Sequence, residues 1–222
     1  MHEVDPLALF HHRAVPAEPN GSPLALLLLH GTGGDEDDLI PLGPYLAPGA
    51  ALLSPRGRVL EDGAPRFFRR VAEGVFDEED LRHRTDELAR FVRAARTRYG
   101  IDERPLVAVG FSNGANIAGS LLLLVPDALD GAILLRGMTP LTPESPPRLA
   151  GKRLFLGAGR ADPLVRPYES ERWAETLRGA GADVTLHWSD TGHALSQGDV
   201  DAAREWLRER FPLSPARPGG RS

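Results

Sequence analysis

Short apolar runs alternate with longer amphipathic segments along most of this 222-residue chain. The runs are rich in Leu, Val and Ile and end near Gly, Pro, Ser or His; they are residues 24–29, 50–53, 106–111, 131–135, 154–156 and 184–188. Apolar runs of this length, without polar alternation, are typical of parallel strands that are buried on both faces. The pattern therefore predicts an α/β fold with a mostly parallel central sheet and helices on both faces.

The segments between these runs have the period of helices. The expected helices are residues 78–99, 113–124, a segment around Trp173 and Leu177, and residues 200–211. Asp77 is a candidate N-cap for the first of them, and Gly100 is placed to end it. Residues 113–124 are apolar almost all round, which predicts a helix that is buried against the sheet.

The chain is predicted to form a single domain over residues 1–211, because about 150 residues is the usual size of one domain. Residues 137–147 are expected to form an ordered but irregular loop after a strand, and residues 54–76 form a longer connection. Neither is expected to be a domain boundary. The tail 212–222 holds three prolines, two glycines and two arginines with almost nothing to bury, which predicts disorder.

Composition narrows the possible functions. The net charge is -5 and basic residues do not form a block, which argues against a nucleic-acid partner. The chain has no cysteine, which excludes disulfides, thiolate metal sites and a cysteine nucleophile. The N-terminus carries acids where a signal peptide needs bases, and the aliphatic runs are too short to span a bilayer. We therefore expect a cytoplasmic protein with no membrane span.

The sequence Gly110-Phe111-Ser112-Asn113-Gly114 places a serine in a G-x-S-x-G motif between a predicted strand and a predicted helix. A serine in a sharp strand-to-helix turn needs small neighbours, because the strained backbone leaves no room for side chains at the two glycine positions. The turn also lifts the hydroxyl clear of the sheet. This context makes Ser112 a candidate nucleophile.

A serine hydroxyl is a weak nucleophile at neutral pH and needs a base to take its proton. His193 is the candidate base because it follows the last predicted strand, at the sheet edge where functional loops gather. His187 lies within a strand, and four other histidines have no strand end beside them: His2, His11, His12 and His83. The alternative is that His193 is a loop histidine that caps a helix.

The imidazole needs a carboxylate to hold one tautomer, and the chain order in this arrangement is Ser, then Asp or Glu, then His. Asp162 fits this order, in the loop after the strand that ends at Leu156. Asp183, which starts a strand at the opposite edge, and Asp190, three residues before His193, are weaker rivals. The alternative role for Asp162 is that of a turn aspartate before proline.

An oxyanion needs two backbone N–H donors, one from the residue after the nucleophile and one from the loop after an early strand. Asn113 and Thr32 occupy these positions, Thr32 within the glycine-rich run 30–34. A phosphate cradle is the rival use of such a run. However, Glu36 replaces the third glycine of the dinucleotide fingerprint, the P-loop motif does not occur, and the acids at 35–38 would repel phosphate.

Four motifs in this order resemble those of the small α/β-hydrolases of the phospholipase/carboxylesterase group, which includes acyl-protein thioesterases. They are the loop 30–36, the serine turn 110–116, Asp162-Pro163 and Gly192-His193. The stretch 65–77 is also similar to a bacterial branch of carboxylesterases in that group. The likeness extends from about residue 24 to residue 211 and implies an α/β-hydrolase fold with little or no cap domain.

By this resemblance, Ser112 is the nucleophile, His193 is the base, Asp162 is its orienting acid, and the amides of Thr32 and Asn113 form the oxyanion hole. The resemblance implies no metal and no organic cofactor. It also implies a small-molecule ester as the binding partner and a homodimer as the assembly.

The implied reaction is hydrolysis of carboxylic esters or thioesters, with small to medium acyl chains, through an acyl-serine intermediate. Apolar side chains in loops are candidates to line the acyl pocket, with plain loop packing as the alternative: Phe67, Phe68, Phe76, Met138 and Leu164. Arg136 stands where a neutral residue or histidine is expected, so it either makes this pocket polar or pairs with an acid. Arg69 and Arg70 are adjacent, so only one of them can point inward in regular structure.

Two functions from other classes remain open. A ligand-binding protein on a hydrolase scaffold would keep these residues but turn over negligibly, and a serine-directed fluorophosphonate would fail to label Ser112. An acyltransferase would pass the acyl group to an alcohol or a thiol, which product analysis with added acceptors would reveal.

Overall fold

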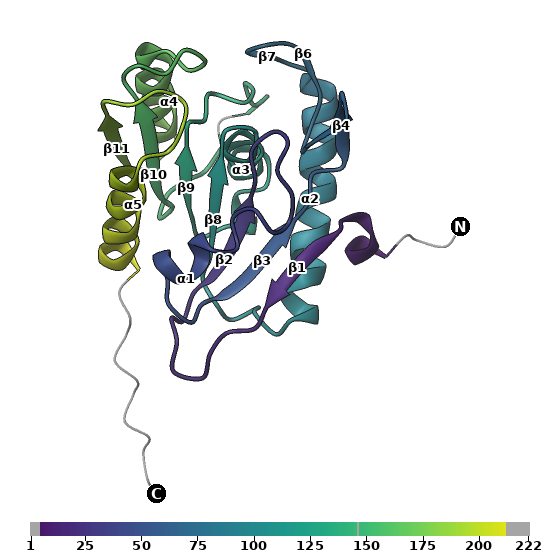
Figure 1. The fold of residues 1–222 in the computed structure, drawn as a ribbon. Coiled ribbons are helices and arrows are strands. Elements are labelled where there is room, and N and C mark those ends of the chain that lie inside the picture. Colours follow the sequence, from purple (N-terminus) through teal and green to yellow (C-terminus); the bar gives the residue numbers. More distant parts are fainter. Residues whose placement is uncertain (1–4, 146, 212–222) are drawn as a thin grey trace, which may run out of the picture.

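The apolar runs form a seven-stranded sheet in the order β1-β3-β2-β8-β9-β10-β11 (Figure 1). The computed structural model describes residues 5–145 and 147–211. The strands are β1 (His12–Val15), β2 (Ala25–Leu29), β3 (Ala51–Pro55), β8 (Leu106–Phe111), β9 (Gly131–Leu135), β10 (Arg153–Gly159) and β11 (Asp183–Ser189). Only β1 pairs with its neighbour in the antiparallel sense, so the predicted mostly parallel sheet is confirmed.

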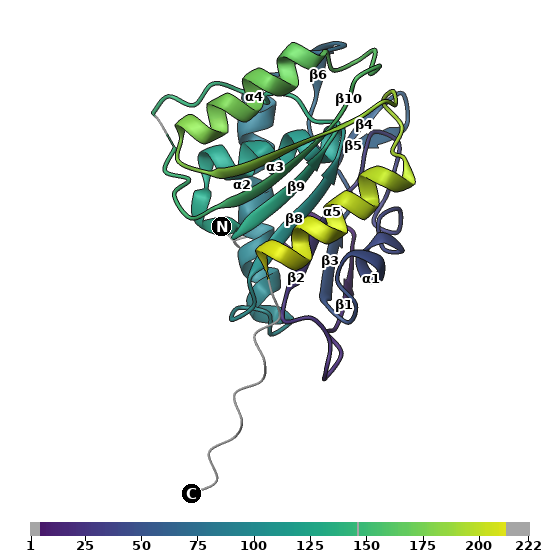
Figure 2. The same cartoon turned by 90° about the vertical axis from the view of Figure 1, so that its left-hand side faces the viewer.

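Helices cover both faces of this sheet (Figure 2). They are α1 (Leu42–Leu46), α2 (Glu78–Arg98), α3 (Asn113–Leu124), α4 (Pro167–Gly179) and α5 (Gln197–Arg210), with short 3-10 turns at Pro6–Leu9 and Pro126–Ala128. The helices α2, α3 and α4 pack on one face, and α1 and α5 pack on the other. The predicted arrangement of helices is therefore confirmed.

Strand β2 shows why its run is apolar throughout. Its side chains alternate between the two faces, so Leu27 and Leu29 join the core under α2, α3 and α4, while Leu26 and Leu28 join the core under α1 and α5. All four leucines are completely buried. An alternating polar pattern would place polar groups in one of the two cores.

Helix α2 begins as the sequence predicts. The carboxylate of Asp77 accepts a hydrogen bond from the Asp80 amide at 3.0 Å and caps the first turn. Gly100 has φ of +63°, a left-handed conformation that glycine adopts without strain and that ends the helix.

Several short elements are absent from the sequence-based expectations. These are β1, α1 and two hairpins within the connection 54–76, made of β4 (Val59–Glu61) with β5 (Ala64–Arg66) and β6 (Arg70–Ala72) with β7 (Val75–Phe76). Asp62 and Gly63 turn the first hairpin with φ of +50° and +84°. An Asp-Gly pair between short runs is a strong hairpin signal, so this element could have been predicted.

The carboxyl ends of the parallel strands meet at one edge of the sheet. The register places Leu29 beside Gly110, Phe111 beside Leu135, and Gly159 beside Ser189. Loops that follow β2, β8, β9, β10 and β11 therefore gather there, and the hairpins β4-β5 and β6-β7 lie near the same edge.

The predicted disorder of residues 212–222 lies outside the described residues. Over the part of the chain that the structure does describe, none of the helices combines the length and apolar character needed to cross a bilayer.

Candidate active site

Ser112 lies in a strained turn between β8 and α3. Its φ of +51° and ψ of -113° are rare for a residue with a side chain. A Cβ at Gly110 would lie 2.5 Å from the carbonyl oxygen of Gly114, and a Cβ at Gly114 would overlap the carbonyl oxygen of Leu29. Both glycines of the motif are therefore required by sterics. The Ser112 amide donates to the carbonyl of Leu135 at 2.8 Å and ties the turn to β9.

A hydrogen-bonded chain joins Ser112, His193 and Asp162. The Ser112 hydroxyl lies 2.9 Å from Nε2 of His193, and Nδ1 of His193 lies 2.9 Å from Oδ2 of Asp162. A carboxylate can only accept, so Nδ1 carries the proton and Nε2 is left to accept from the serine. Residues 81 positions apart in the sequence are thus brought into contact at the sheet edge.

The Asp162 carboxylate is held on both of its oxygens. While Oδ2 faces the imidazole, Oδ1 accepts from the amides of Leu164 and Val165 at 2.8 and 3.2 Å. The side chain is 1% exposed, and His193 is 22% exposed. This arrangement fixes one orientation of the carboxylate and leaves the imidazole open to a ligand.

The other candidates for the acid and the base lie away from Ser112. The Asp190 side chain is 93% exposed and pairs with Arg160. Asp183 lies at the start of β11, at the far edge of the sheet, and accepts from Arg210. His187 is in the middle of β11 and stacks on Phe155. None of them contacts Ser112.

Thr32 and Asn113 line the same pocket as Ser112. Among the described residues, neither backbone amide donates to a protein acceptor. Their side chains are pinned from the hairpin region: the Thr32 hydroxyl accepts from Arg66 at 3.0 Å, and the Asn113 side-chain oxygen accepts from the Phe67 amide at 2.8 Å. Two N–H donors are thus available beside the serine.

His30 begins the glycine-rich loop and has no role among the sequence-based predictions. Its Nδ1 donates to the Gly31 carbonyl at 2.6 Å, and its Nε2 accepts from the Gly57 amide at 2.9 Å. Burial lowers the pKa of His30, because the charged imidazolium is poorly solvated there, although the hydrogen bond to the Gly31 carbonyl and the charges of Asp38 and Asp35 act in the opposite direction. The neutral ring therefore links the Thr32 loop to the segment after β3.

Replacement of His30 by glutamine is expected to weaken the pH dependence of stability. A histidine whose pKa is lowered on folding stabilises the protein above its unfolded pKa of about 6.5, and this stabilisation is lost as the pH falls toward the lower folded pKa. In that window, the slope of the free energy of unfolding in His30→Gln should fall by up to about 1.4 kcal/mol per pH unit.

Urea unfolding between pH 8 and pH 5 measures this slope. His11→Gln is the matched control because His11 is exposed. Equal slopes in wild type and His30→Gln would contradict a neutral His30.

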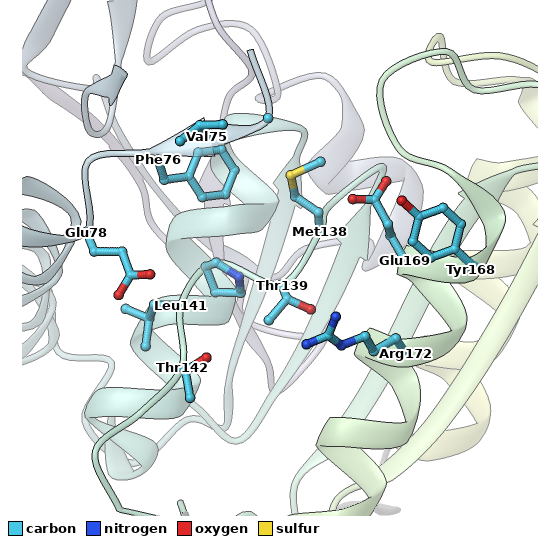
Figure 3. Close-up of a pocket in the computed structure, with 12 residues that line it drawn as sticks. Val75, Phe76, Glu78, Met138, Thr139, Leu141, Thr142, Tyr168, Glu169 and Arg172 are labelled. Carbon is cyan, nitrogen blue, oxygen red and sulfur yellow. The ribbon is translucent and has the colours of Figure 1, made fainter. Parts of the chain in front are cut away.

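Ser112 and His193 open onto a pocket of about 250 Å³. Its walls combine polar with apolar side chains, among them Arg66, Arg70, Glu73, Asn116, Met138, Leu164 and Val165. A second cavity of about 410 Å³ shares Gly74 and Met138 with it. Its walls come from the β6-β7 hairpin, the loop after β9 and the start of α4, with Phe76, Leu141 and Arg172 among the lining residues (Figure 3).

Two of the candidate acyl-pocket residues are misplaced by the sequence analysis. Phe67 and Phe68 are 2% and 0% exposed and belong to the hydrophobic core, so they line neither cavity. Met138 lines both cavities, Phe76 lines the larger one and Leu164 lines the smaller one. For Phe67 and Phe68 the alternative role, packing within the protein, is therefore the one observed. The segment between the two hairpins directs both rings into the hydrophobic core.

The structure also shows the contacts of the three arginines whose roles the sequence does not decide. Arg69 pairs with Asp77, and Arg70 pairs with Glu61 at 2.8 Å and lines the smaller pocket. Arg136 pairs with an acid, Asp199, as the second of its two alternatives has it, and it is also among the residues that line the smaller pocket.

Comparison with known proteins gives matches over most of the chain. Residues 68–210 match the model of the phospholipase/carboxylesterase family. The protein MhqD of Bacillus subtilis (strain 168) is 49% identical over 192 residues, which is 86% of this chain and 96% of MhqD.

Solved structures match as well. The Bacillus cereus carboxylesterase is 48% identical with a TM-score of 0.88, covering 92% of this chain and 96% of that chain. A carboxylesterase from Mesorhizobium loti is 34% identical with a TM-score of 0.83, covering 89% of this chain and 94% of that chain.

Proposed function

The chain belongs to the phospholipase/carboxylesterase family of hydrolases, and from that premise we propose that it cleaves carboxylic esters through an acyl-serine intermediate at Ser112. Membership confirms the resemblance drawn from the sequence, and with it the α/β-hydrolase fold. The observation that carries the proposal is the chain of two 2.9 Å hydrogen bonds from Ser112 through His193 to Asp162.

Ser112, His193 and Asp162 each have a separate role in the proposed reaction. The Ser112 oxygen attacks the ester carbonyl carbon while Nε2 of His193 takes the hydroxyl proton. Asp162 holds the imidazole in the required tautomer and stabilises its charged form. The same Nε2–H then donates its proton to the leaving alcohol, and the acyl group stays on Ser112.

Water completes the cycle by the same route. His193 takes a proton from water, the resulting oxygen attacks the acyl carbon, and Ser112 leaves with its proton restored. In both steps negative charge develops on the carbonyl oxygen, and the amides of Thr32 and Asn113 are the donors for it. A thioester reacts by the same steps with a thiol as the leaving group.

The larger cavity is proposed to hold the acyl chain. The leaving group must face Nε2 of His193, which reaches the site from the loop before α5, on one side of the sheet. The larger cavity lies on the other side, against α2 and α4, and Met138 connects it to the smaller pocket. The ester arm that points away from His193 is the acyl arm.

Apolar side chains at the cavities offer contacts to an apolar acyl arm, although the charged side chains of Glu78, Glu169 and Arg172 also line the larger cavity. Val75, Leu164 and Tyr168 lie around them on three different segments, with 53%, 41% and 65% of their surface exposed. Exposed apolar side chains that cluster at a cavity are typical of a ligand site. The available volume fits a chain longer than acetyl, so turnover in a p-nitrophenyl ester series from acetate to laurate should peak above acetate.

A bulky side chain in the larger cavity is expected to lower kcat/KM for esters with long acyl chains and to leave kcat/KM for short esters almost unchanged. Thr139 lines the larger cavity (Figure 3) but not the smaller pocket. In Thr139→Phe, the kcat/KM for p-nitrophenyl octanoate should fall about 10- to 50-fold, because each methylene kept out of the cavity loses about 0.8 kcal/mol of burial. The kcat/KM for the acetate should stay within about twofold.

The control for this prediction is Thr97→Phe, at an exposed position near the end of α2. Both variants are assayed with the same two esters. A parallel loss for acetate and octanoate in Thr139→Phe, or no loss for either, would place the acyl chain elsewhere.

A further inference from the structure

Arg136 directly follows β9, and its guanidinium is completely buried. It forms an ion pair with Asp199, in which Nη2 lies 2.7 Å from Oδ2 and both side chains are 0% exposed. Two buried charges lose their hydration, so such a pair is weak evidence for a contribution to stability alone. The question is therefore what else the guanidinium contacts.

The guanidinium of Arg136 holds the backbone on both sides of His193. Its Nε donates to the Gly192 carbonyl at 3.0 Å, and its Nη2 lies 3.4 Å from the Ala194 carbonyl. The Thr191 hydroxyl accepts from the same Nη2 at 2.9 Å. One rigid group thus fixes the loop immediately before and after the imidazole.

The end of β9, next to Arg136, is tied to the nucleophile turn. Its φ of +57° is left-handed, and its amide donates to the Gly157 carbonyl at 2.8 Å. The preceding residue, Leu135, accepts the hydrogen bond from the Ser112 amide. Residues 135 and 136 therefore hold the backbone of Ser112 and the backbone on either side of His193.

Asp199 extends the same network to α5. Its Oδ2 also accepts from the amide and the hydroxyl of Ser196, at 2.8 and 2.7 Å, where α5 is capped. Its Oδ1 has no hydrogen bond among the described residues, and the ring of His187 lies 3.9 Å away. Asp199 therefore holds the guanidinium and the start of α5 in one place.

We infer that Arg136, held by Asp199, is a positioning residue that sets the distance and angle of His193 toward Ser112. The inference rests on the proposed role of His193 as the base. Lysine cannot replace arginine here, because a single ammonium lacks the fixed fork that reaches Asp199 and Gly192 together. A purely structural pair would instead affect stability and leave the His193 geometry unchanged.

Two variants test this role, each assayed with the p-nitrophenyl ester that wild type hydrolyses fastest. Arg136→Lys keeps the charge, and Arg136→Met with Asp199→Leu removes both charges together, so that neither is left buried and unpaired. We expect kcat to fall about 10-fold in the lysine variant and about 100-fold in the double variant, with KM within about threefold of wild type.

The matched control removes another ion pair of the chain, in Arg84→Met with Glu87→Leu on α2. That pair, at 2.8 Å, lies away from the His193 loop, so kcat should stay within about twofold even where thermal unfolding shifts. Assays are run well below the unfolding temperature of every variant. Unchanged kcat in the folded Arg136 variants, a loss confined to KM, or an equal kcat loss in the control would overturn the inference.

A measurement independent of turnover separates this inference from the proposed function. The proton NMR signal of Nδ1–H of His193, identified by its absence in His193→Gln, reports the hydrogen bond to Asp162. It should be present in wild type and in the α2 control and be lost or broadened in the Arg136→Met, Asp199→Leu variant. An unchanged signal in that variant overturns the positioning role whether or not wild type hydrolyses esters, whereas wild type without esterase turnover overturns only the proposed function.

Discussion

Ser112→Ala is expected to lower ester turnover by about 10⁴- to 10⁶-fold, because His193 and Asp162 act only through the serine oxygen. The fold should be unaffected: the Ser112 side chain makes no capping hydrogen bond to α3, and alanine fits the same space. The free energy of unfolding should therefore stay within about 1 kcal/mol of wild type. The assay is p-nitrophenyl ester hydrolysis by the two proteins purified in parallel.

The control for this prediction is Ser145→Ala, at an exposed serine in the loop after β9, which should retain wild-type activity. A fluorophosphonate provides a second readout, since it should label Ser112 in wild type and leave Ser112→Ala unlabelled. Equal turnover in wild type and Ser112→Ala would mean that the activity does not arise at Ser112. Labelling without hydrolysis would favour an acyl-transfer function, and the absence of both labelling and turnover would favour a ligand-binding function.

Asp162→Asn is expected to lower kcat by about 10³- to 10⁴-fold. Both carboxylate oxygens accept hydrogen bonds, Oδ2 from His193 and Oδ1 from the amides of Leu164 and Val165. Asparagine has one accepting oxygen, so its NH₂ group must face either those amides or Nδ1 of His193. If it faces the imidazole, Nδ1 has to accept, Nε2 carries the proton, and the serine loses its base.

Asp190→Asn is the matched control, because Asp190 is close to His193 in the sequence but its side chain is 93% exposed. Its kcat should stay within about twofold of wild type. Near wild-type turnover in Asp162→Asn would assign the orienting acid to another carboxylate. Loss in both variants would show that the loops after β10 and after β11 are coupled more strongly than the hydrogen bonds indicate.

The sheet could be predicted from the sequence because the burial of a strand is encoded in contiguous residues. The run 24–29 is apolar at every position since β2 lies between two helical layers, and this property is visible without knowledge of its neighbours. The hydrophobic pattern that predicts a strand or helix is weaker in the short elements β1 and α1. Strand β1 has one exposed and three half-buried residues, so its sequence does not show a clear apolar face.

The candidate site was predictable where local backbone geometry restricts residue choice. The glycines around Ser112 are required because a Cβ at either position would meet backbone atoms, and such a requirement leaves a motif in the sequence. The positions of His193 and Asp162 follow from the rule that parallel strands end at the same edge. The structure brings these two side chains to the serine, as the strand order leads one to expect.

The sequence by itself thus determined the α/β fold class, the serine turn and the order of the candidate acid and base, all of which depend on contiguous residues or on strand direction. Only the tertiary structure decided that Arg136 pairs with Asp199, 63 positions away, and that Phe67 and Phe68 turn into the core. Partner choice for a side chain depends on the paths of loops that meet in space. Neither periodicity nor motif spacing records those paths, because each loop is positioned by the elements packed against it.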